Sequence, residues 1–189
     1  MILLYRSIKE KKRGFMLQLF APKKYIKDYR FVDFNDLKKQ GIKLLICDID
    51  NTLAAHDQKH PDEKVKKFIK SVQAQHFEIC LISNNVSERV ETFAKELHLP
   101  TYPMAKKPLK KTYRKIIEDY RVNPHEIAAI GDQLLTDVLG GNRMGIYTIL
   151  TVPLYQKDLI WTKINRTLEN QVFKRLEKKG YLKKGECDE

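Results

Sequence analysis

Short apolar runs alternate with longer segments of helical periodicity along this chain. Residues 44–47, 79–82 and 127–130 are apolar throughout, which is typical of strands that are buried on both faces of a parallel sheet. Residues 62–75 and 87–97 instead place their apolar side chains at helical spacing. This alternation predicts an α/β fold, a Rossmann-like parallel sheet with helices on both faces.

The remaining elements are less regular. Residues 101–104 predict a short strand. The segment that opens at Pro108 has helical apolar spacing as far as Tyr120, and because proline is favoured at the first helical position, we expect this helix to begin at the proline. Residues 163–179 predict an amphipathic closing helix. The chain therefore divides into an N-terminal extension (1–43), an α/β core (44–150) and a C-terminal helical segment that packs on the core (151–189).

Polar side chains follow each of the three apolar runs. The residues concerned are Asp48, Asp50, Thr52, Ser83, Asn84, Asp132 and Asp137. The carboxyl ends of parallel strands meet at one edge of a sheet, where open α/β folds bind ligands, so we expect these side chains to lie together. Two acids one residue apart are costly to crowd unless a positive group lies between them. Asp48 and Asp50 alone fit a turn or a helix cap equally well, and the recurrence of the pattern favours a binding site.

Four motifs stand in order in this region. They are D-I-D-N-T from residue 48, S-N-N from 83, K-K-P from 106 and G-D-x4-D from 131. The ordered set resembles the haloacid dehalogenase (HAD) superfamily of Mg²⁺-dependent aspartyl phosphotransferases, and the resemblance covers residues 44–150. In that superfamily an acid two residues after the nucleophile accompanies phosphoryl transfer, so Asp50 implies a phosphatase rather than a dehalogenase.

Hydrolysis of a phosphate monoester needs such a set of groups, because the substrate is a dianion that repels an anionic nucleophile. The resemblance implies that Asp48 is the nucleophile and a Mg²⁺ ligand. It implies that Asp50 is the general acid/base, whose backbone carbonyl also binds the metal. Asp132 would be the second side-chain metal ligand. Thr52 would belong to the phosphate-binding group and stabilise the loop that holds Asp50.

The same resemblance assigns the groups that hold the phosphoryl oxygens. Ser83 would bind the phosphoryl group through its hydroxyl, together with the following amide of Asn84. Lys107 would steady the phosphoryl group and the aspartyl-phosphate, because it directly precedes the proline. Lys106, one position earlier in the chain, is the alternative for this role. Asp137 would be an outer acid that orients the lysine or a metal-bound water.

The spacing of the motifs leaves no room for a cap domain. About thirty residues separate Thr52 from Ser83, and a predicted helix and strand already occupy them. A second predicted helix and strand occupy the segment from Ser83 to Lys107. A capless site is open to solvent, which suits a protein, a nucleic acid or a lipid headgroup at a membrane, whereas a small metabolite profits from enclosure.

Charge is spread unevenly along the 189 residues. The net charge is +12, of which residues 1–43 carry +8, residues 44–150 carry +1 and residues 151–189 carry +3. The N-terminal extension mixes its cations with apolar and aromatic residues. This mixture predicts contact with an anionic membrane surface or with a phosphate-rich polymer, or else a helix that packs its apolar side on the core. These interpretations stay open, and packing does not exclude membrane contact.

Other features narrow the class of protein. The sequence shows no signal peptide and no apolar stretch long enough to cross a bilayer. Cys47 and Cys80 lie in predicted strands and Cys187 lies in a polar tail, which argues against a disulfide framework. The five histidines show no convincing ligand spacing. We therefore expect a cytoplasmic location, with the inner face of the membrane as a peripheral site of contact.

Within the superfamily, D-I-D-N-T, S-N-N, A-K-K-P and G-D-Q-L-L-T-D-V-x-G-G-N-R-x-G are similar to the YqeG-type class IIIA phosphatases. That group is similar to phosphatases that remove the terminal phosphate of phosphatidylglycerophosphate, so the resemblance implies a lipid-headgroup phosphatase at a membrane surface. A phosphatase of a soluble nucleotide, sugar phosphate or phosphoprotein is one alternative. An RNA- or ribosome-binding module with a vestigial site is another, against which the intact Asp48 and Asp50 argue. The sequence makes no prediction of oligomeric state.

Overall fold

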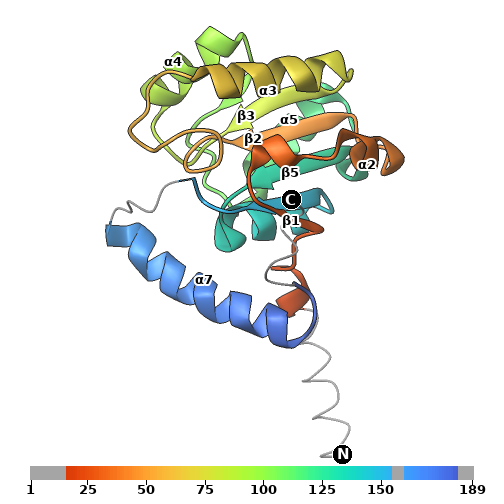
Figure 1. Ribbon diagram of the computed structural model, residues 1–189, viewed down its shortest axis with the longest axis vertical. Helices are drawn as coiled ribbons and strands as arrows, with labels where there is room; N and C mark the ends of the chain where they lie inside the picture. Colours follow the sequence, from red (N-terminus) through yellow and green to blue (C-terminus); the bar gives the residue numbers. More distant parts are fainter. Residues whose placement is uncertain (1–15, 155–159, 183–189) are drawn as a thin grey trace, which may run out of the picture.

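The computed structural model describes residues 16–154 and 160–182. Its centre is a six-stranded parallel sheet in the order β1-β6-β5-β2-β3-β4 (Figure 1). The strands are β1 (Lys24–Ile26), β2 (Leu44–Asp48), β3 (Glu78–Ile82), β4 (Thr101–Tyr102), β5 (Ile127–Gly131) and β6 (Tyr147–Thr151). The helices are α2 (Phe34–Lys39), α3 (Glu63–Ala74), α4 (Ser87–Leu97), α5 (Lys110–Tyr120), α6 (Leu139–Asn142) and α7 (Ile160–Lys178), with helical turns η1 (Tyr29–Phe31), η2 (Pro124–Glu126) and η3 (Leu134–Val138). The predicted α/β fold is confirmed.

The central strand β2 has an apolar core on each side. Successive side chains of a strand point to opposite faces. Leu45 and Cys47 therefore join the core that includes side chains of α3 and α4. Leu44 and Ile46 join the core that includes side chains of α5. The uninterrupted apolar runs of the sequence thus mark strands that helices cover on both faces, α3 and α4 on one side and α5 on the other (Figure 1).

The register of three strands places the predicted polar residues at one edge of the sheet. Asp48 is opposite Ile82 of β3, and Cys47 is opposite Ile130 of β5. Residues 83 and 132 consequently lie one position beyond the level of Asp48. The strand order also changes direction at β2, because β3 lies on one side of it and β5 on the other. Such a switch point is where open α/β sheets bind ligands.

Two helices that follow this edge begin differently. α3 begins after Asp62, whose carboxylate caps the helix by accepting a hydrogen bond from the backbone N–H of Val65 at 2.9 Å. α5 begins at Lys110, so the expectation that this helix starts at Pro108 is wrong. The reason is that Leu109 has an extended backbone (φ −68°, ψ 143°) and occupies the N-cap position. The lysine–proline pair therefore lies in a loop that precedes the helix.

The connections between the motifs contain no cap domain in the described residues 16–154. Residues 52–83 are occupied by a loop, α3 and β3, and residues 83–107 by α4, β4 and their loops. The edge of the sheet that carries Asp48 is thus not covered by an inserted domain in either connection.

The described part of the N-terminal segment belongs to the same sheet. β1 pairs in parallel with β6, and the sequence analysis foresaw neither strand. Leu17 and Phe20 pack against a core cluster that includes Leu176 of α7. Apolar side chains of this segment therefore contribute to packing. Residues 1–15 lie outside the described residues, and membrane contact through the segment 1–43 stays a prediction.

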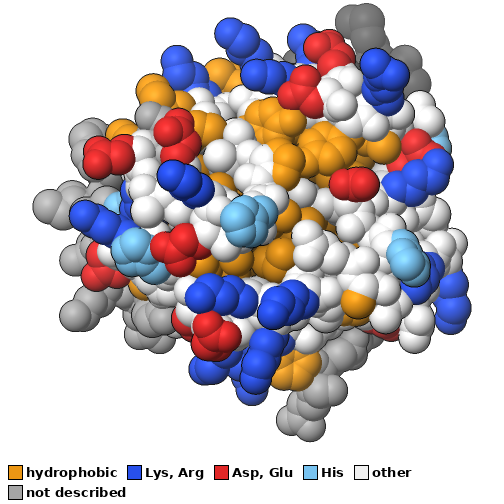
Figure 2. Space-filling view, turned by 90° about the horizontal axis from the view of Figure 1, so that it is seen from above, with side chains coloured by type: hydrophobic (Ala, Val, Ile, Leu, Met, Phe, Trp, Pro, Cys, Tyr) orange, Lys and Arg blue, Asp and Glu red, His pale blue; other side chains and the backbone are white. Residues whose placement is uncertain are grey.

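Among the described residues, no helix combines the length and the apolar character that crossing a bilayer requires. The face over α3 and α4 is shown in Figure 2, where basic and acidic side chains are interspersed around hydrophobic ones. This face therefore does not present a field of one sign.

The packing of α7 can be tested with a pair of leucines on the same helix. Leu176 is fully buried, whereas Leu168 is 50% exposed. We expect Leu176→Ala to lower the free energy of unfolding by about 2–5 kcal/mol, because it leaves a cavity in the core. The control Leu168→Ala should change it by about 0.5 kcal/mol or less. Urea unfolding followed by circular dichroism measures both, and equal effects would contradict the packing described here.

Candidate active site

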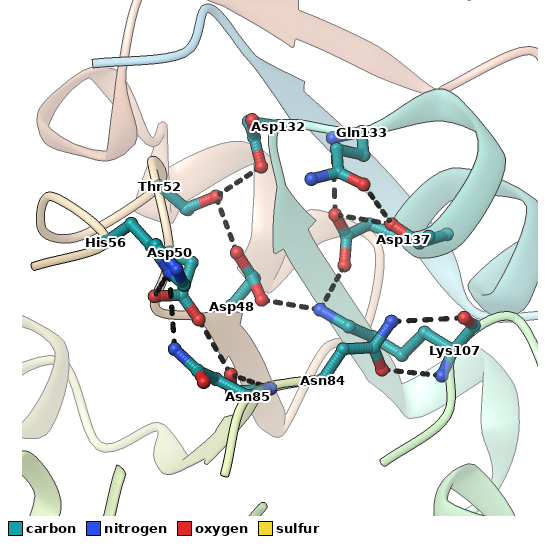
Figure 3. A network of polar contacts seen from close by, with 12 residues as sticks. Asp48, Asp50, Thr52, His56, Asn84, Asn85, Lys107, Asp132, Gln133 and Asp137 are labelled. Atoms are coloured by element: carbon teal, nitrogen blue, oxygen red, sulfur yellow. Dashed lines mark hydrogen bonds and ion pairs between the residues drawn. The ribbon is translucent and has the colours of Figure 1, made fainter. Parts of the chain in front are cut away.

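Lys107 lies between two buried carboxylates at the centre of the site (Figure 3). Its Nζ donates hydrogen bonds to Asp48 at 2.5 Å and to Asp137 at 2.6 Å. The lysine side chain is only 3% exposed. Asp48 ends β2, Asp137 lies in η3, and Lys107 lies in the loop before α5. A single ammonium therefore joins three elements that are far apart in the sequence.

The charges of this cluster are not balanced. Burial alone would lower the pKa of Lys107, but Asp137 and Asp48 raise it above its usual value, so the side chain is a cation. Burial raises the pKa of Asp48; Lys107 opposes this rise, and Asp137 adds to it. Burial also raises the pKa of Asp132 well above its usual range, and Asp48 and Asp137 raise it further. Three crowded carboxylates thus share one ammonium.

The three acids are close enough to share a further cation. One carboxylate oxygen from each of Asp48, Asp132 and Asp137 lies within 4.8 Å of the others. The hydroxyl of Thr52 donates to Asp48 at 3.1 Å and to Asp132 at 3.4 Å, the second being long for a hydrogen bond of this type. Buried carboxylate oxygens without a full set of donors are the ligands that a hard divalent cation prefers. The residues present therefore fit a divalent metal such as Mg²⁺.

Asp137 is fixed from two sides. One oxygen accepts the hydrogen bond from Lys107, and the other accepts one from the backbone N–H of Gln133 at 3.2 Å. Gly131 makes room for this acid, because a Cβ at that position would lie 2.2 Å from Cγ of Asp137. Only glycine at the end of β5 allows this close approach.

Asp50 meets a different set of groups. Its carboxylate accepts hydrogen bonds from the hydroxyl of Ser83 at 2.8 Å and from Nη1 of Arg89 at 2.7 Å. Nδ1 of His56 lies 3.3 Å from the same carboxylate. Nη2 of Arg89 donates to the backbone carbonyl of Ala55 at 2.7 Å. The hydroxyl of Ser83, which the family resemblance assigns to the phosphoryl group, thus donates to Asp50 in this structure.

Arg89 is a site residue that the sequence analysis missed. Its side chain is 11% exposed, and its Nε is buried without a hydrogen-bond partner among the described residues. None of the four motifs includes it. The available signal is its position in the first turn of α4, a helix that begins at the same edge of the sheet as the S-N-N motif. His56 gave no signal, because the five histidines show no convincing ligand spacing and none of the four motifs includes it.

The loop after β3 determines which of the two neighbouring lysines, Lys106 or Lys107, enters the site. The side chain of Asn84 accepts a hydrogen bond from the backbone N–H of Lys107 at 2.7 Å and donates one to its carbonyl at 3.1 Å. Lys106 is exposed and has a positive φ of 54°. The structure therefore brings Lys107, and not Lys106, to Asp48.

The fold and the cluster of acids define the class of protein. A crystal structure of an uncharacterised protein from Listeria monocytogenes serotype 4b shares the fold with a TM-score of 0.50 and 16% identity, over 70% of this chain and 99% of that chain. The parallel sheet, into which the described residues 16–154 insert no cap, together with the motifs at the ends of β2, β3 and β5, is that of a HAD-superfamily phosphatase.

Comparison of sequences identifies the family within this class. The profile of the family described as Mitochondrial PGP phosphatase matches residues 15–154. "Probable phosphatase YqeG" of Bacillus subtilis (strain 168) is 32% identical over 165 residues, which cover 87% of this chain and 96% of that protein. Phosphatidylglycerophosphate phosphatase 1 of Arabidopsis thaliana, chloroplastic/mitochondrial, is 27% identical over 92% of this chain and 52% of that protein, so the chain spans about half of its length. The chain belongs to the Mitochondrial PGP phosphatase family.

Because the three carboxylates are crowded, we expect the loss of one of them to stabilise the metal-free protein and to weaken metal binding. Asp132→Asn keeps the shape of the side chain but removes its ability to ionise. We expect it to raise the Tm of the metal-free protein at neutral pH by a few degrees, because folding must either protonate this acid or bury its charge, and both destabilise the fold. We also expect it to abolish most of the Tm increase that Mg²⁺ causes by binding the folded state.

Differential scanning calorimetry in EDTA and in Mg²⁺ measures both effects. Glu91→Gln, which neutralises an exposed acid of α4, is the matched control and should leave both Tm values nearly unchanged. An unaltered Mg²⁺ response in Asp132→Asn would show that the cation binds elsewhere.

Proposed function

We propose that this phosphatase acts through an aspartyl-phosphate, with Asp48 as the nucleophile and Mg²⁺ as the cofactor. The observation that carries the proposal is the contact of 2.5 Å between the buried carboxylate of Asp48 and the ammonium of Lys107. The lysine orients an oxygen of the nucleophile. It also offers positive charge where a phosphoryl dianion would approach, which lowers the repulsion between the two anions.

In the first step an oxygen of Asp48 forms a bond to phosphorus while the bond from phosphorus to the ester oxygen breaks. The departing oxygen takes a proton from Asp50, which Ser83 and Arg89 hold by hydrogen bonds of 2.8 Å and 2.7 Å. In the second step a water oxygen attacks the same phosphorus and gives a proton to Asp50. The bond to Asp48 then breaks, which releases inorganic phosphate and restores both carboxyl groups to their starting states.

Mg²⁺ would be held by the carboxylates of Asp48 and Asp132 and by the backbone carbonyl of Asp50. When bound, the cation supplies positive charge that stabilises the phosphoryl oxygens during transfer. Thr52 aligns the two carboxylates, because its hydroxyl reaches both. Asp137 keeps Lys107 in place, and we assign Ser83 and the amide of the following residue to the phosphoryl oxygens once substrate is present.

The proposed substrate is phosphatidylglycerophosphate, which the enzyme would convert to phosphatidylglycerol at a membrane surface. The family description and the name of the Arabidopsis relative support this choice. The open edge of the sheet supports it as well, because a site without a cap in the described residues 16–154 can reach a phosphate that stays anchored in a bilayer. Location in the cytoplasm, with peripheral contact at the inner face of the membrane, is part of the same proposal.

The substrate is tested by measuring phosphate release with Mg²⁺ from vesicle-borne phosphatidylglycerophosphate and from soluble nucleotides, sugar phosphates and an aryl phosphate. A strong preference for the lipid supports the proposed substrate. Turnover of soluble esters alone keeps the chemistry and moves the substrate to that class. Absence of turnover with every ester, combined with tight RNA binding, would favour a binding module instead.

The nucleophile is tested with Asp48→Asn. An amide cannot form the acyl phosphate, so we expect turnover of lipid and soluble esters alike to fall at least about a thousandfold. Acid quenching after exposure to radiolabelled substrate should trap labelled protein in the unmodified enzyme and none in the variant. Asp57→Asn, an exposed acid of the loop after β2, is the control that should retain activity and label.

The position of Asp50 is tested with substitutions of Arg89. Arg89→Met leaves Asp50 without its charged partner, and a misplaced general acid costs on the order of 10²-fold in kcat. KM should change little, because Arg89 is not assigned to the substrate. Arg89→Lys should recover part of the rate, since a lysine can pair with Asp50 but cannot also hold the carbonyl of Ala55 with the same planar geometry. Arg114→Met, on the exposed side of α5, is the control.

A further inference from the structure

Three exposed apolar side chains lie on the loops that border the site. Val86, Met104 and Leu109 are 62%, 57% and 53% exposed. Val86 follows β3, Met104 follows β4 and Leu109 directly precedes α5, so all three belong to the edge of the sheet that carries Asp48. A single exposed apolar residue is ordinary, but a group of them at the mouth of a site indicates an interaction surface.

Hydrogen bonds hold two of these loops together. The backbone N–H of Met104 donates to the carbonyl of Asn85 at 3.0 Å, directly beside Val86. Asn84 binds the backbone N–H and carbonyl of Lys107, which fixes the loop that continues to α5. The apolar side chains are therefore presented by the same loops that hold the proposed phosphate-binding groups.

The segment that carries two of these apolar residues is strongly basic. Residues 103–115 contain six lysines and arginines and no aspartate or glutamate. Lys107 is buried in the site, but Lys106, Lys111 and Arg114 are exposed. Apolar side chains interspersed with cations, as Met104 and Leu109 are in this segment, suit the boundary of an anionic bilayer, where the apolar groups enter the headgroup region and the cations meet anionic lipids.

The described part of the N-terminal segment offers less apolar surface of this kind. Leu17 and Phe20 pack on the cluster around α7, and Tyr25 packs its ring edge-on against Phe173 of that helix. Met16 and Phe31, at 63% and 38% exposure, are the large apolar residues of this part that stay open to solvent. The exposed apolar side chains next to the site are thus better placed to meet lipid than the apolar side chains of the basic N-terminal segment.

We propose that Val86, Met104 and Leu109, with the exposed Lys106 and Lys111, form a rim that docks the active site directly on an anionic lipid bilayer. The proposal rests on the proposed function in that the phosphate monoester is taken to be presented at the bilayer. It adds an orientation, because docking by this rim turns the carboxyl edge of the sheet toward the membrane. Asp48 then faces the headgroups, and a lipid phosphate reaches it without leaving the bilayer.

The test compares two sets of substitutions in the full chain. The rim variant is Val86→Ser, Met104→Asn and Leu109→Ser together. Val86 and Leu109 occupy N-cap positions where serine is favoured, and Met104 has a φ of 48°, which asparagine tolerates, so these changes suit the fold. The comparison variant, Met16→Gln with Leu168→Gln, removes exposed apolar groups from the N-terminal segment and α7.

Binding is measured by sedimentation with vesicles of phosphatidylcholine that contain phosphatidylglycerol, and turnover with a soluble aryl phosphate and with vesicle-borne phosphatidylglycerophosphate. We expect the rim variant to lose about tenfold or more in vesicle binding and in lipid turnover, because both depend on apolar insertion. Its turnover of the soluble ester should equal that of the unmodified protein, which also shows that it folds. The comparison variant should keep all three properties.

A second pair of variants tests the role of charge. Lys111→Glu reverses a charge on the rim, and Lys70→Glu reverses one on the exposed side of α3, away from this edge. We expect only the first to weaken vesicle binding, and the difference to shrink as salt is added.

The outcomes separate this proposal from the proposed substrate. Lipid turnover and vesicle binding that survive in the rim variant, or that fail in the comparison variant instead, would overturn the docking surface and leave the substrate standing. Vesicle binding that depends on the rim, in a protein that does not hydrolyse the lipid, would overturn the substrate and keep the surface. An unmodified protein that binds no vesicles would overturn the rim outright.

Discussion

The ion pairs of Lys107 are the interactions on which the rest of the site depends. A buried ammonium is tolerated because two carboxylates accept its hydrogen bonds at 2.5 Å and 2.6 Å. Each carboxylate comes from a different part of the fold, so the lysine can make both contacts only when β2, η3 and the loop before α5 are in place. The geometry of catalysis is in this way a consequence of the tertiary structure, and Asn84 secures it from a fourth element by holding the backbone of Lys107.

The excess of acids around this lysine lowers the stability of the fold, and the proposed chemistry gives a reason for it. Three acids crowded about one cation weaken the fold in the absence of a further positive charge. In the proposed chemistry a metal and a phosphoryl group would bring charges of opposite sign, and the site would be complementary to the two together rather than to either alone. Natural sites commonly keep such unfavourable arrangements where chemistry requires them. The buried Nε of Arg89, which has no hydrogen-bond partner among the described residues, is a smaller unfavourable arrangement of this kind.

The central strands, α3 and α4 could be predicted from the apolar patterns of the sequence. The polar residues at the ends of the apolar runs also predicted that Asp48, Ser83 and Asp132 lie at one edge of the sheet. The reason is that parallel strands align their carboxyl ends, so position in a strand predicts position in space. β1 escaped prediction because a three-residue edge strand with lysine at its start has almost no pattern. Arg89 escaped because its partner, Asp50, is 39 residues away in the chain. The start of α5 was misplaced because the rule for proline describes an average preference, and here an extended Leu109 stands between the proline and the helix.

The pairing of β1 with β6 also bears on how the protein is made. Lys24 lies opposite Ile149, so the first strand of the sheet finds its neighbour 125 positions further along the chain. During synthesis the ribosome releases β1 long before β6 exists, and the edge strand has to wait for its partner while β2, β3 and β5 assemble. Contacts of such sequence separation slow folding, because a long loop is closed before any stabilisation is gained. The N-terminal segment, which carries +8 of the net charge of +12, therefore stays without its partner in the sheet until β6 has been synthesised, and its lysines favour solubility over that interval.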